Sequence, residues 1–158
     1  MNLIHRIKEV VMVSVWLAVA TSCGWGNMSY SHFSSVPQVW TWKDTVEFEL
    51  PVLPAGRMYH FEVGVRYTEI YTRRNLRLLL RHNVADSAHW QTDTICCPLY
   101  SSEGLPLGKG LFGLYSLDLP YASLPSDGSH QAQVQIIPCM RSDSLRGISD
   151  VGITVRSE

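Results

Sequence analysis

The sequence lacks an excess of charge of either sign. Lysine and arginine together number 13, aspartate and glutamate number 14, and the formal net charge is −1 at pH 7. Proteins that bind nucleic acid through its phosphates need a strongly basic surface. The composition therefore excludes nucleic acid as an expected partner, and charge alone points to no other class of partner.

The sequence also lacks an apolar run long enough to cross a membrane. The apolar segment 10–20 holds 11 residues, whereas a membrane-spanning helix needs about 20. His5, Arg6 and Lys8 precede this segment, and Thr21-Ser22-Cys23 follows it. A basic start, a short apolar segment and small residues at the cleavage point are typical of a secretory signal peptide.

Cys23 follows the small residues directly, in the manner of a bacterial lipoprotein signal. In that class the thiol is acylated and the peptide is cut before the cysteine. We therefore predict a lipoprotein signal peptide over 1–22 and lipid attachment at Cys23, which makes a lipid bilayer the first expected partner. Each buried methylene contributes ~0.8 kcal/mol, so two or three acyl chains anchor stably. The alternative is an ordinary signal peptide in which Cys23 has no role.

Cysteines are few, four in all. If Cys23 carries lipid, Cys96, Cys97 and Cys139 remain, and an exported protein meets an oxidising compartment. Neighbouring residues of a strand point to opposite faces, so Cys139 can pair with Cys96 or with Cys97 but not with both. We predict one such disulfide. The alternative is three unpaired cysteines that behave as small hydrophobic residues.

After residue 23 no long segment has the 3.6-residue apolar period of a helix. Apolar and polar residues instead alternate, which predicts half-buried strands. The clearest alternating segments are 45–50, 59–67, 75–81, 131–136 and 151–155. With turn residues between them, they predict seven to nine strands in an all-β, antiparallel β-sandwich of the jelly-roll or immunoglobulin-like kind. We place this single domain at 37–158, after a Gly-, Ser- and Asn-rich tether over 23–36.

Motifs for catalysis, cofactors or metals are missing. Residues 108–113 match G-x-G-x-x-G, but no helix is expected to follow, so a loop with glycines at positive φ is the better interpretation. His82, His89, Cys96 and Cys97 do not have the spacing of a zinc site. There is no G-x-S-x-G motif. The sequence thus predicts no enzyme, no cofactor and no metal, and a hydrolase ranks last among its functions.

Aromatic residues offer a candidate contact surface. Val39-Trp40-Thr41-Trp42 would place two tryptophans on one face of a strand, and Trp90 could extend that surface. Exposed rings could stack on sugars, so the alternative function is a carbohydrate-binding lipoprotein. Trp40 and Trp42 could equally form the inner face of the first strand, because large aromatic residues dominate cores.

The last segment carries a family resemblance. Leu145-Arg146-Gly147-Ile148-Ser149-Asp150-Val151-Gly152-Ile153-Thr154-Val155 resembles the closing L-x-G-[IV]-x-D-V-G-[LIF]-[RK]-[IV] segment of the GldH gliding-motility lipoproteins. Shorter stretches agree with that family in the same order along the chain. They are Trp42-Lys43-Asp44 with Val46-Glu47-Phe48, Val65-Arg66 with Tyr71 and Asn75-Leu76, Thr92-Asp93-Thr94, Leu107-Gly108-Lys109-Gly110 with Gly113, and Pro138-Cys139-Met140-Arg141.

This resemblance implies a non-enzymatic envelope lipoprotein associated with gliding motility or type IX secretion, acting through contacts with other envelope or motility proteins. It carries no catalytic residues over, and only Cys23 as a site. Leu107 stands where the family usually has tryptophan. The residues after Cys23 lack the acidic cluster of a surface-export signal, so we expect a lipid anchor in the outer membrane and a domain that faces the periplasm.

Overall fold

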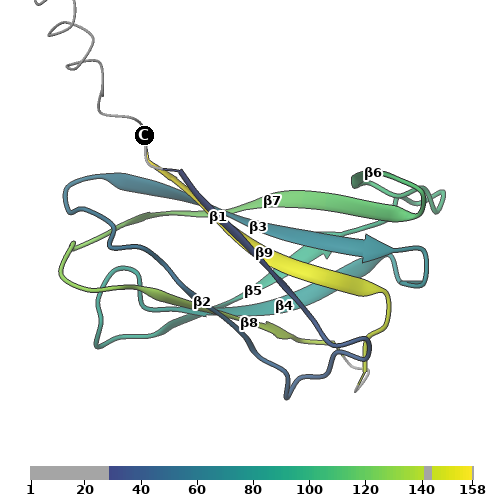
Figure 1. The fold of residues 1–158 in the computed structure, drawn as a ribbon, viewed down its shortest axis with the longest axis horizontal. Helices are drawn as coiled ribbons and strands as arrows, with labels where there is room; N and C mark the ends of the chain where they lie inside the picture. The colour runs from purple at the N-terminus through teal and green to yellow at the C-terminus, as the bar shows by residue number, and fades with distance from the viewer. Residues whose placement is uncertain (1–28, 141–143, 158) are drawn as a thin grey trace, which may run out of the picture.

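The computed structural model describes residues 29–140 and 144–157, and in these ranges it contains two packed antiparallel sheets (Figure 1). One sheet has the strand order β1-β9-β3-β7-β6 and the other β2-β8-β4-β5. The bounds are β1 Ser29–Ser35, β2 Val46–Glu49, β3 Met58–Thr68, β4 Asn75–His82, β5 Gln91–Pro98, β6 Lys109–Leu111, β7 Leu114–Pro125, β8 Gln133–Pro138 and β9 Ile148–Ser157. The predicted β-sandwich is confirmed.

The pairing of strands identifies the sandwich as a jelly roll. The antiparallel pairs β1–β9, β2–β8, β3–β7 and β4–β5 are nested along the chain, and successive pairs alternate between the two sheets. Eight strands wound in this way are the jelly-roll arrangement. The short β6 adds a ninth strand beside one end of β7. The jelly-roll alternative in the sequence prediction is therefore the correct one.

The core lies between the sheets and is built by the predicted alternation. In β3 the side chains from Tyr59 to Tyr67 at every second position are buried, and β4 repeats this pattern from Leu76 to Leu80. Side chains of this kind stand perpendicular to a strand and face one side of its sheet. The inner faces also contain Val46, Phe48, Val134, Ile136, Val151, Ile153 and Val155.

The sandwich has two ends with different loops. The loops 50–57, 83–90 and 126–132 lie at the end where β1 begins, which we call the N-terminal end. The loops 36–45, 69–74, 99–108 and 139–147 and the β6–β7 turn lie at the opposite end, which we call the distal end. The 11 residues of β3 connect the two ends, a length of about 35 Å at 3.4 Å per residue.

The predicted tether over 23–36 is wrong for Ser29–Ser35, which form β1 at the edge of a sheet beside β9. The ring of Phe33 lies over two glycines of the neighbouring strands, where a Cβ on Gly152 or Gly64 would come within 2.7 Å or 2.4 Å of the ring. The guanidinium of Arg66 lies 4.1 Å from the centre of the same ring. Glycines that receive an aromatic ring in this way pin the register of a strand. The signal peptide and Cys23 lie outside the described residues.

Candidate contact surface at the distal end

The β6–β7 hairpin projects from the distal end. Leu111 pairs with Leu114 across a two-residue turn formed by Phe112 and Gly113. Their φ angles are 55° and 78°, which is the type I′ geometry that matches the twist of the strands. Asn and Gly are favoured at such positions, whereas another side chain in the left-handed region costs about 1 kcal/mol. Phe112 is the only non-glycine residue with positive φ in the described part of the chain.

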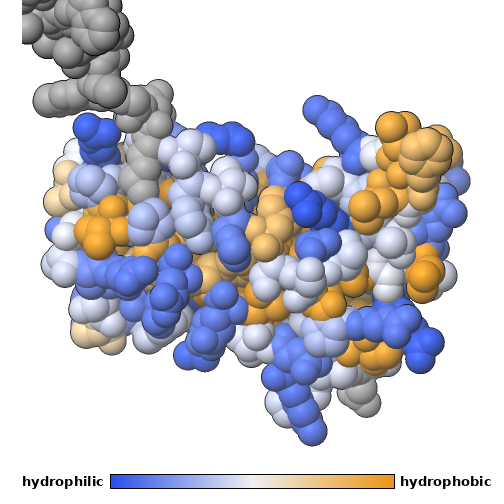
Figure 2. All heavy atoms as spheres, in the orientation of Figure 1, coloured by the Kyte–Doolittle hydropathy of each residue, from blue (hydrophilic) through white to orange (hydrophobic). Residues whose placement is uncertain are grey.

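The hairpin turn is apolar and open to solvent. The side chain of Phe112 is fully exposed, at 103%. Leu111 and Leu114 flank the turn and are exposed as well. Leu105 and Leu107, in the loop before β6, are also exposed. Figure 2 shows hydrophobic side chains gathered at the corner of the molecule where Figure 1 labels β6. Contiguous apolar patches larger than a few hundred Å² are rare on monomeric proteins and mark interaction sites.

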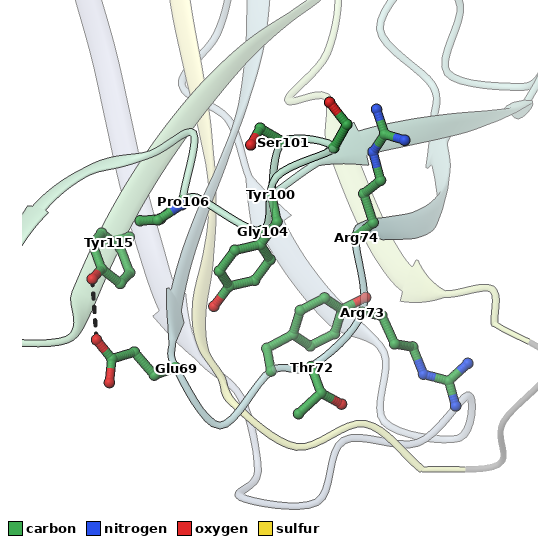
Figure 3. Close-up of a pocket in the computed structure, with 11 residues that line it drawn as sticks. Glu69, Thr72, Arg73, Arg74, Tyr100, Ser101, Gly104, Pro106 and Tyr115 are labelled. Atoms are coloured by element: carbon green, nitrogen blue, oxygen red, sulfur yellow. Dashed lines mark hydrogen bonds between the residues drawn. The ribbon is translucent and has the colours of Figure 1, made fainter.

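A pocket of about 580 Å³ lies beside the hairpin (Figure 3). It is lined by Glu69, Tyr71, Thr72, Arg73, Arg74, Tyr100, Ser101, Ser102, Gly104, Pro106 and Tyr115. The hairpin and the pocket are contiguous, because a Cβ on Gly113 would lie 3.5 Å from the Glu69 carboxyl carbon. We call the exposed residues 105, 107, 111, 112 and 114 together with this pocket the distal surface.

Three tyrosine rings brace the pocket. Tyr67, in the core, lies with its ring centre 5.5 Å from that of Tyr100 and 5.6 Å from that of Tyr115. Its hydroxyl donates to the carbonyl of Leu99 at 2.7 Å and accepts from the backbone N–H of Gly108 at 2.9 Å. Both bonds tie the loop between β5 and β6 to the core. The aromatic side of the pocket is therefore held before any partner arrives.

The polar groups of the pocket divide into two sides. The Tyr115 hydroxyl donates to Glu69 Oε1 at 3.2 Å, and burial, followed by this hydrogen bond, raises the pKa of Tyr115. Arg73 and Arg74 lie on the other side of the pocket from this pair (Figure 3). Within the described residues neither guanidinium makes an ion pair. The pocket thus combines an aromatic side that carries the Glu69 carboxylate with a second side that carries two cations without an ion-pair partner among the described residues.

The tryptophans predicted as a contact surface do not form one. Trp40 is fully buried, and its Nε1 donates to the carbonyl of Asp44 at 2.7 Å. Trp42 is 61% exposed in a turn at the distal end, and Trp90 is 37% exposed at the N-terminal end. Residues 39–42 are not a strand but a bridge followed by a turn, so the two side chains do not share a face. The predicted sugar-stacking platform is absent.

The predicted disulfide is also wrong, since Cys96, Cys97 and Cys139 are all free. Cys96 pairs with Arg77 on one side of β4, and the N–H of Cys139 donates to the carbonyl of Arg77 on the other side. Two strand spacings, about 10 Å, therefore separate the backbones of Cys96 and Cys139, whereas a disulfide needs Cα atoms within about 7 Å. Cys97 points into the core, where burial raises the pKa of its thiol to about 12.

The G-x-G-x-x-G stretch is the hairpin itself. Gly113 has the positive φ that was expected, whereas Gly108 and Gly110 are needed for close approach. A Cβ on Gly110 would lie 2.0 Å from the carbonyl oxygen of Leu114.

In the ranges 29–140 and 144–157 no three His, Cys, Asp or Glu side chains converge as a metal site, and no helix is long and apolar enough to span a membrane.

A polar chain links the two sheets at the open flank between β5 and β7. Tyr121 is the extra residue of a β-bulge in β7, and its hydroxyl donates to Asp93 Oδ2 at 2.5 Å. That hydroxyl oxygen accepts from His82 Nε2 at 3.0 Å. The Nδ1 atom of His82 is buried and has no partner. Burial therefore lowers the pKa of His82, against the opposing effect of Asp93.

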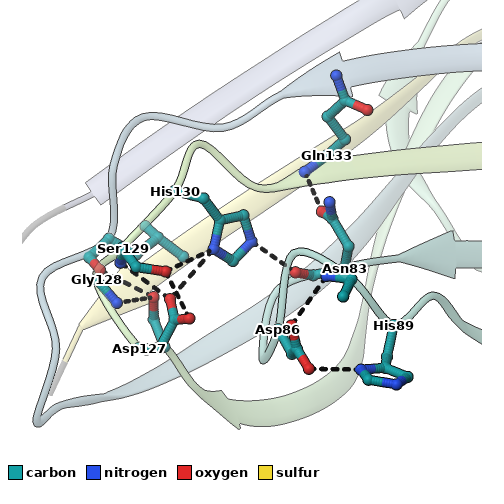
Figure 4. A network of polar contacts seen from close by, with 11 residues as sticks. Asn83, Asp86, His89, Asp127, Gly128, Ser129, His130 and Gln133 are labelled. Carbon is teal, nitrogen blue, oxygen red and sulfur yellow. Dashed lines mark hydrogen bonds and ion pairs between the residues drawn. The ribbon is translucent and has the colours of Figure 1, made fainter.

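The N-terminal end is closed by hydrogen bonds between its loops (Figure 4). His130 Nε2 donates to the carbonyl of Asn83 at 2.8 Å, and its Nδ1 contacts Asp127 Oδ1 at 3.1 Å. Asn83 Oδ1 accepts from the N–H of Gln133 at 2.7 Å. The Ser126 hydroxyl donates to the carbonyl of Leu53 at 2.9 Å. These hydrogen bonds join the loops of this end to one another.

Sequence reasoning missed the distal surface because its residues come from distant segments. One local signal was available: Phe112-Gly113 lies between apolar residues, which is a hairpin pattern with an unusual first turn residue. The pocket had no comparable signal, since it is assembled from the β3–β4 loop, the β5–β6 loop and β7.

Comparison with known families settles the relationship of the chain. The model of the GldH lipoprotein family matches residues 28–155. The chain belongs to the GldH lipoprotein family. Members are lipoproteins associated with gliding motility, which implies a lipid-anchored position in the cell envelope. No curated protein matches the chain. Among solved structures, the Eiger TNF from S. frugiperda is similar over 84% of this chain and 92% of its own, with 11% identity and a TM-score of 0.39.

The GldH motif at the end of the chain has a structural explanation. Gly147 has φ 86°, and a Cβ there would lie 2.2 Å from the backbone nitrogen of Tyr71. Asp150 accepts a hydrogen bond from the Ser35 hydroxyl at 2.9 Å, and Gly152 receives the Phe33 ring. In this chain the closing segment therefore holds β1, the strand that leads to the predicted anchor, against the rest of the sheet.

Proposed function

We propose that this GldH-family protein is a non-enzymatic envelope protein that is anchored through acylated Cys23 and binds partner proteins at its distal surface. The family match supports the lipid anchor. We place the anchor in the outer membrane, and the absence of an acidic export cluster after Cys23 supports a domain that faces the periplasm. The partners are other envelope proteins of the motility or secretion machinery.

The observation that carries this proposal is the separation between the predicted anchor and the distal surface. Cys23 is six residues before Ser29, a reach of at most about 20 Å for an extended chain. The apolar hairpin lies at the far end of β3, about 35 Å of strand away from the start of β1. The anchor thus holds the N-terminal end near its membrane and leaves the distal surface available to proteins.

The hydrogen bonds at the two ends also support partner binding at the distal end. Loops at the N-terminal end satisfy one another, as in the contacts of His130 and Ser126. At the distal end the exposed apolar side chains and the guanidinium groups of Arg73 and Arg74 have no such partners within the described chain. Protein interfaces are built around exposed aromatic and arginine side chains of this kind.

The test uses the full-length protein in the cells that produce it. A photoreactive benzoylphenylalanine replaces Phe112 in one strain and Val52, an exposed apolar residue at the N-terminal end, in a matched control. Irradiation should join position 112 to a protein and leave position 52 without that product. Cys23→Ala should lose the acyl mass and leave the membrane fraction. A Cys23→Ala protein that is processed and retained like the wild type would contradict the lipid anchor. Equal amounts of crosslinked product at positions 52 and 112 would contradict the contact surface.

A further inference from the structure

The inference concerns the chemistry of the partner and rests on the proposed function. Around the pocket and the hairpin the exposed cations are Arg73, Arg74, Lys109 and Arg146. The acidic residues nearby are Glu69 and Glu103. Both of these are engaged internally, Glu69 with the Tyr115 hydroxyl and Glu103 with the Ser102 hydroxyl. Hydrogen bonds from neutral hydroxyls leave both carboxylates charged, but the four cations outnumber them among the described residues. The surroundings of the apolar centre therefore carry a net positive charge, although the whole chain is nearly neutral.

Phe112 marks the centre of this surface. A phenylalanine at the first position of a type I′ turn is less stable there than asparagine or glycine, and its ring makes no compensating contact, because it is fully exposed. Strain that the folded chain does not recover is a sign of function. The conformation holds the ring away from the domain, where it can enter an apolar recess of another protein.

The pocket supplies the complementary half. Its volume of about 580 Å³ is within the range of ligand pockets, and it suits one or two large side chains better than a whole domain. Tyr100 and Tyr115 flank it with rings already fixed by Tyr67. An apolar side chain placed between them would leave a neighbouring carboxylate beside Arg73 and Arg74, in reach of charge-assisted hydrogen bonds.

We propose that the distal surface binds an acidic protein segment that carries large apolar side chains. Charge complementarity selects the acidic segment, since the free cations surround the apolar centre, and complementary charge gives specificity at a protein interface. The anchor's own membrane is the less suitable occupant, because it meets the N-terminal end, about 35 Å away along β3.

A random 12-residue peptide library displayed on phage tests this chemistry. The target is the full-length lipidated protein in detergent micelles. The enriched peptides should have a net negative charge and at least one aromatic or leucine residue. The double variant Arg73→Glu/Arg74→Glu should lose or reverse the charge bias, because both guanidiniums are exposed and their replacement leaves the core intact.

Phe112→Asn is the informative second variant, because asparagine suits the turn and the protein stays folded. This substitution should lower the affinity for the best acidic peptide at least tenfold. Val52→Asn, at the N-terminal end, should change the affinity for the same peptide less than twofold. Enriched peptides that are neutral or basic overturn the inference, as does an acidic peptide whose affinity is unchanged in the arginine double variant.

The in-cell photoproduct separates failure of this inference from failure of the proposed function. A protein joined to position 112 through an acidic segment supports both. A protein joined through a neutral or basic segment overturns the partner chemistry and leaves the proposed function standing. A phospholipid, or a second copy of this chain, at position 112 overturns both.

Discussion

The two ends of the sandwich use the same fold in opposite ways. At the N-terminal end the loops bind one another, as His130 does with Asn83 and Asp127. At the distal end the hairpin turn exposes Phe112 in a conformation that favours glycine or asparagine. The loops of the N-terminal end are joined by side-chain hydrogen bonds, whereas the distal end has an exposed apolar hairpin beside a pocket with two arginines. The difference indicates that the candidate contact surface lies at the end of the sandwich opposite the start of β1.

The largest expected effect comes from β1, the strand that leads to the predicted anchor. Gly152→Val would place methyl groups where the Phe33 ring now lies, with Cγ and Cδ1 only 2.7 Å from the new Cβ. Overpacking of this kind costs about 2 kcal/mol, and for a domain of this size it lowers the melting temperature by about 8 °C. Urea and thermal unfolding measure it.

The control for this effect is a double-mutant cycle. In a Phe33→Ala background the ring is gone, so Gly152→Val should cost about 1 kcal/mol less than in the wild type. Equal costs in both backgrounds would mean that Phe33 does not hold β1 through the glycine positions.

The next effect has the opposite sign and lies at the distal end. Phe112→Asn should stabilise the domain by about 1 kcal/mol, because asparagine is more favourable at positive φ and no buried contact is lost. Phe112→Ala is the matched control, since it removes the ring but keeps a side chain that is disfavoured there. Urea unfolding of the three proteins compares them. A loss of stability in Phe112→Asn would show that the ring makes contacts that hold the hairpin.

A smaller effect is expected from acid at the flank between the two ends. The folded-state pKa of His82 lies below its unfolded value because the ring is buried, so the unfolded chain binds the extra proton first. The contribution of the neutral His82 ring to the free energy of unfolding is fully present above the unfolded pKa of about 6.5. This contribution declines as the pH falls below that value. Unfolding free energies from pH 7.5 to pH 5 should therefore fall more steeply in the wild type than in His82→Phe. Parallel curves for the two proteins would refute the role of the buried ring.

The last prediction involves little stability change and concerns the thiols. At pH 8 a thiol reagent should modify Cys96 and Cys139 in the folded protein, because both are exposed. Cys97 should react only after unfolding, since it is buried and burial raises its pKa to about 12. Mass spectrometry before and after denaturation counts the modified thiols. Protection of Cys139 together with Cys96 in the folded, unreduced protein would restore the disulfide that the sequence suggested.

Local pattern was a sound guide to the central strands. The alternating segments 59–67 and 75–81 became β3 and β4 almost without change of boundary, because each strand buries one face and exposes the other. β1 escaped prediction for a physical reason. Its serines and histidine resemble a linker, and its order comes from Phe33 lying on glycines of β3 and β9, which are more than 30 residues away.

The family assignment was also available from short motifs, since their order along the chain agrees with the model match over residues 28–155. The sites were not. The sequence placed Trp40 and Trp42 together, but a turn after the bridge at Trp40 separates them. It allowed Cys139 to meet Cys96, but β4 lies between β5, which carries Cys96, and β8, which ends directly before Cys139.

By itself, the sequence determined that the chain is an all-β lipoprotein of the GldH kind, because alternation, targeting signals and ordered motifs are local properties. Only the tertiary structure decided which end of the sandwich is closed and which is open. That outcome depends on the nested pairing of strands, which brings the β3–β4 loop, the β5–β6 loop and the β6–β7 hairpin to one end. Contacts between segments so far apart in the chain leave no periodic signal in the order of residues.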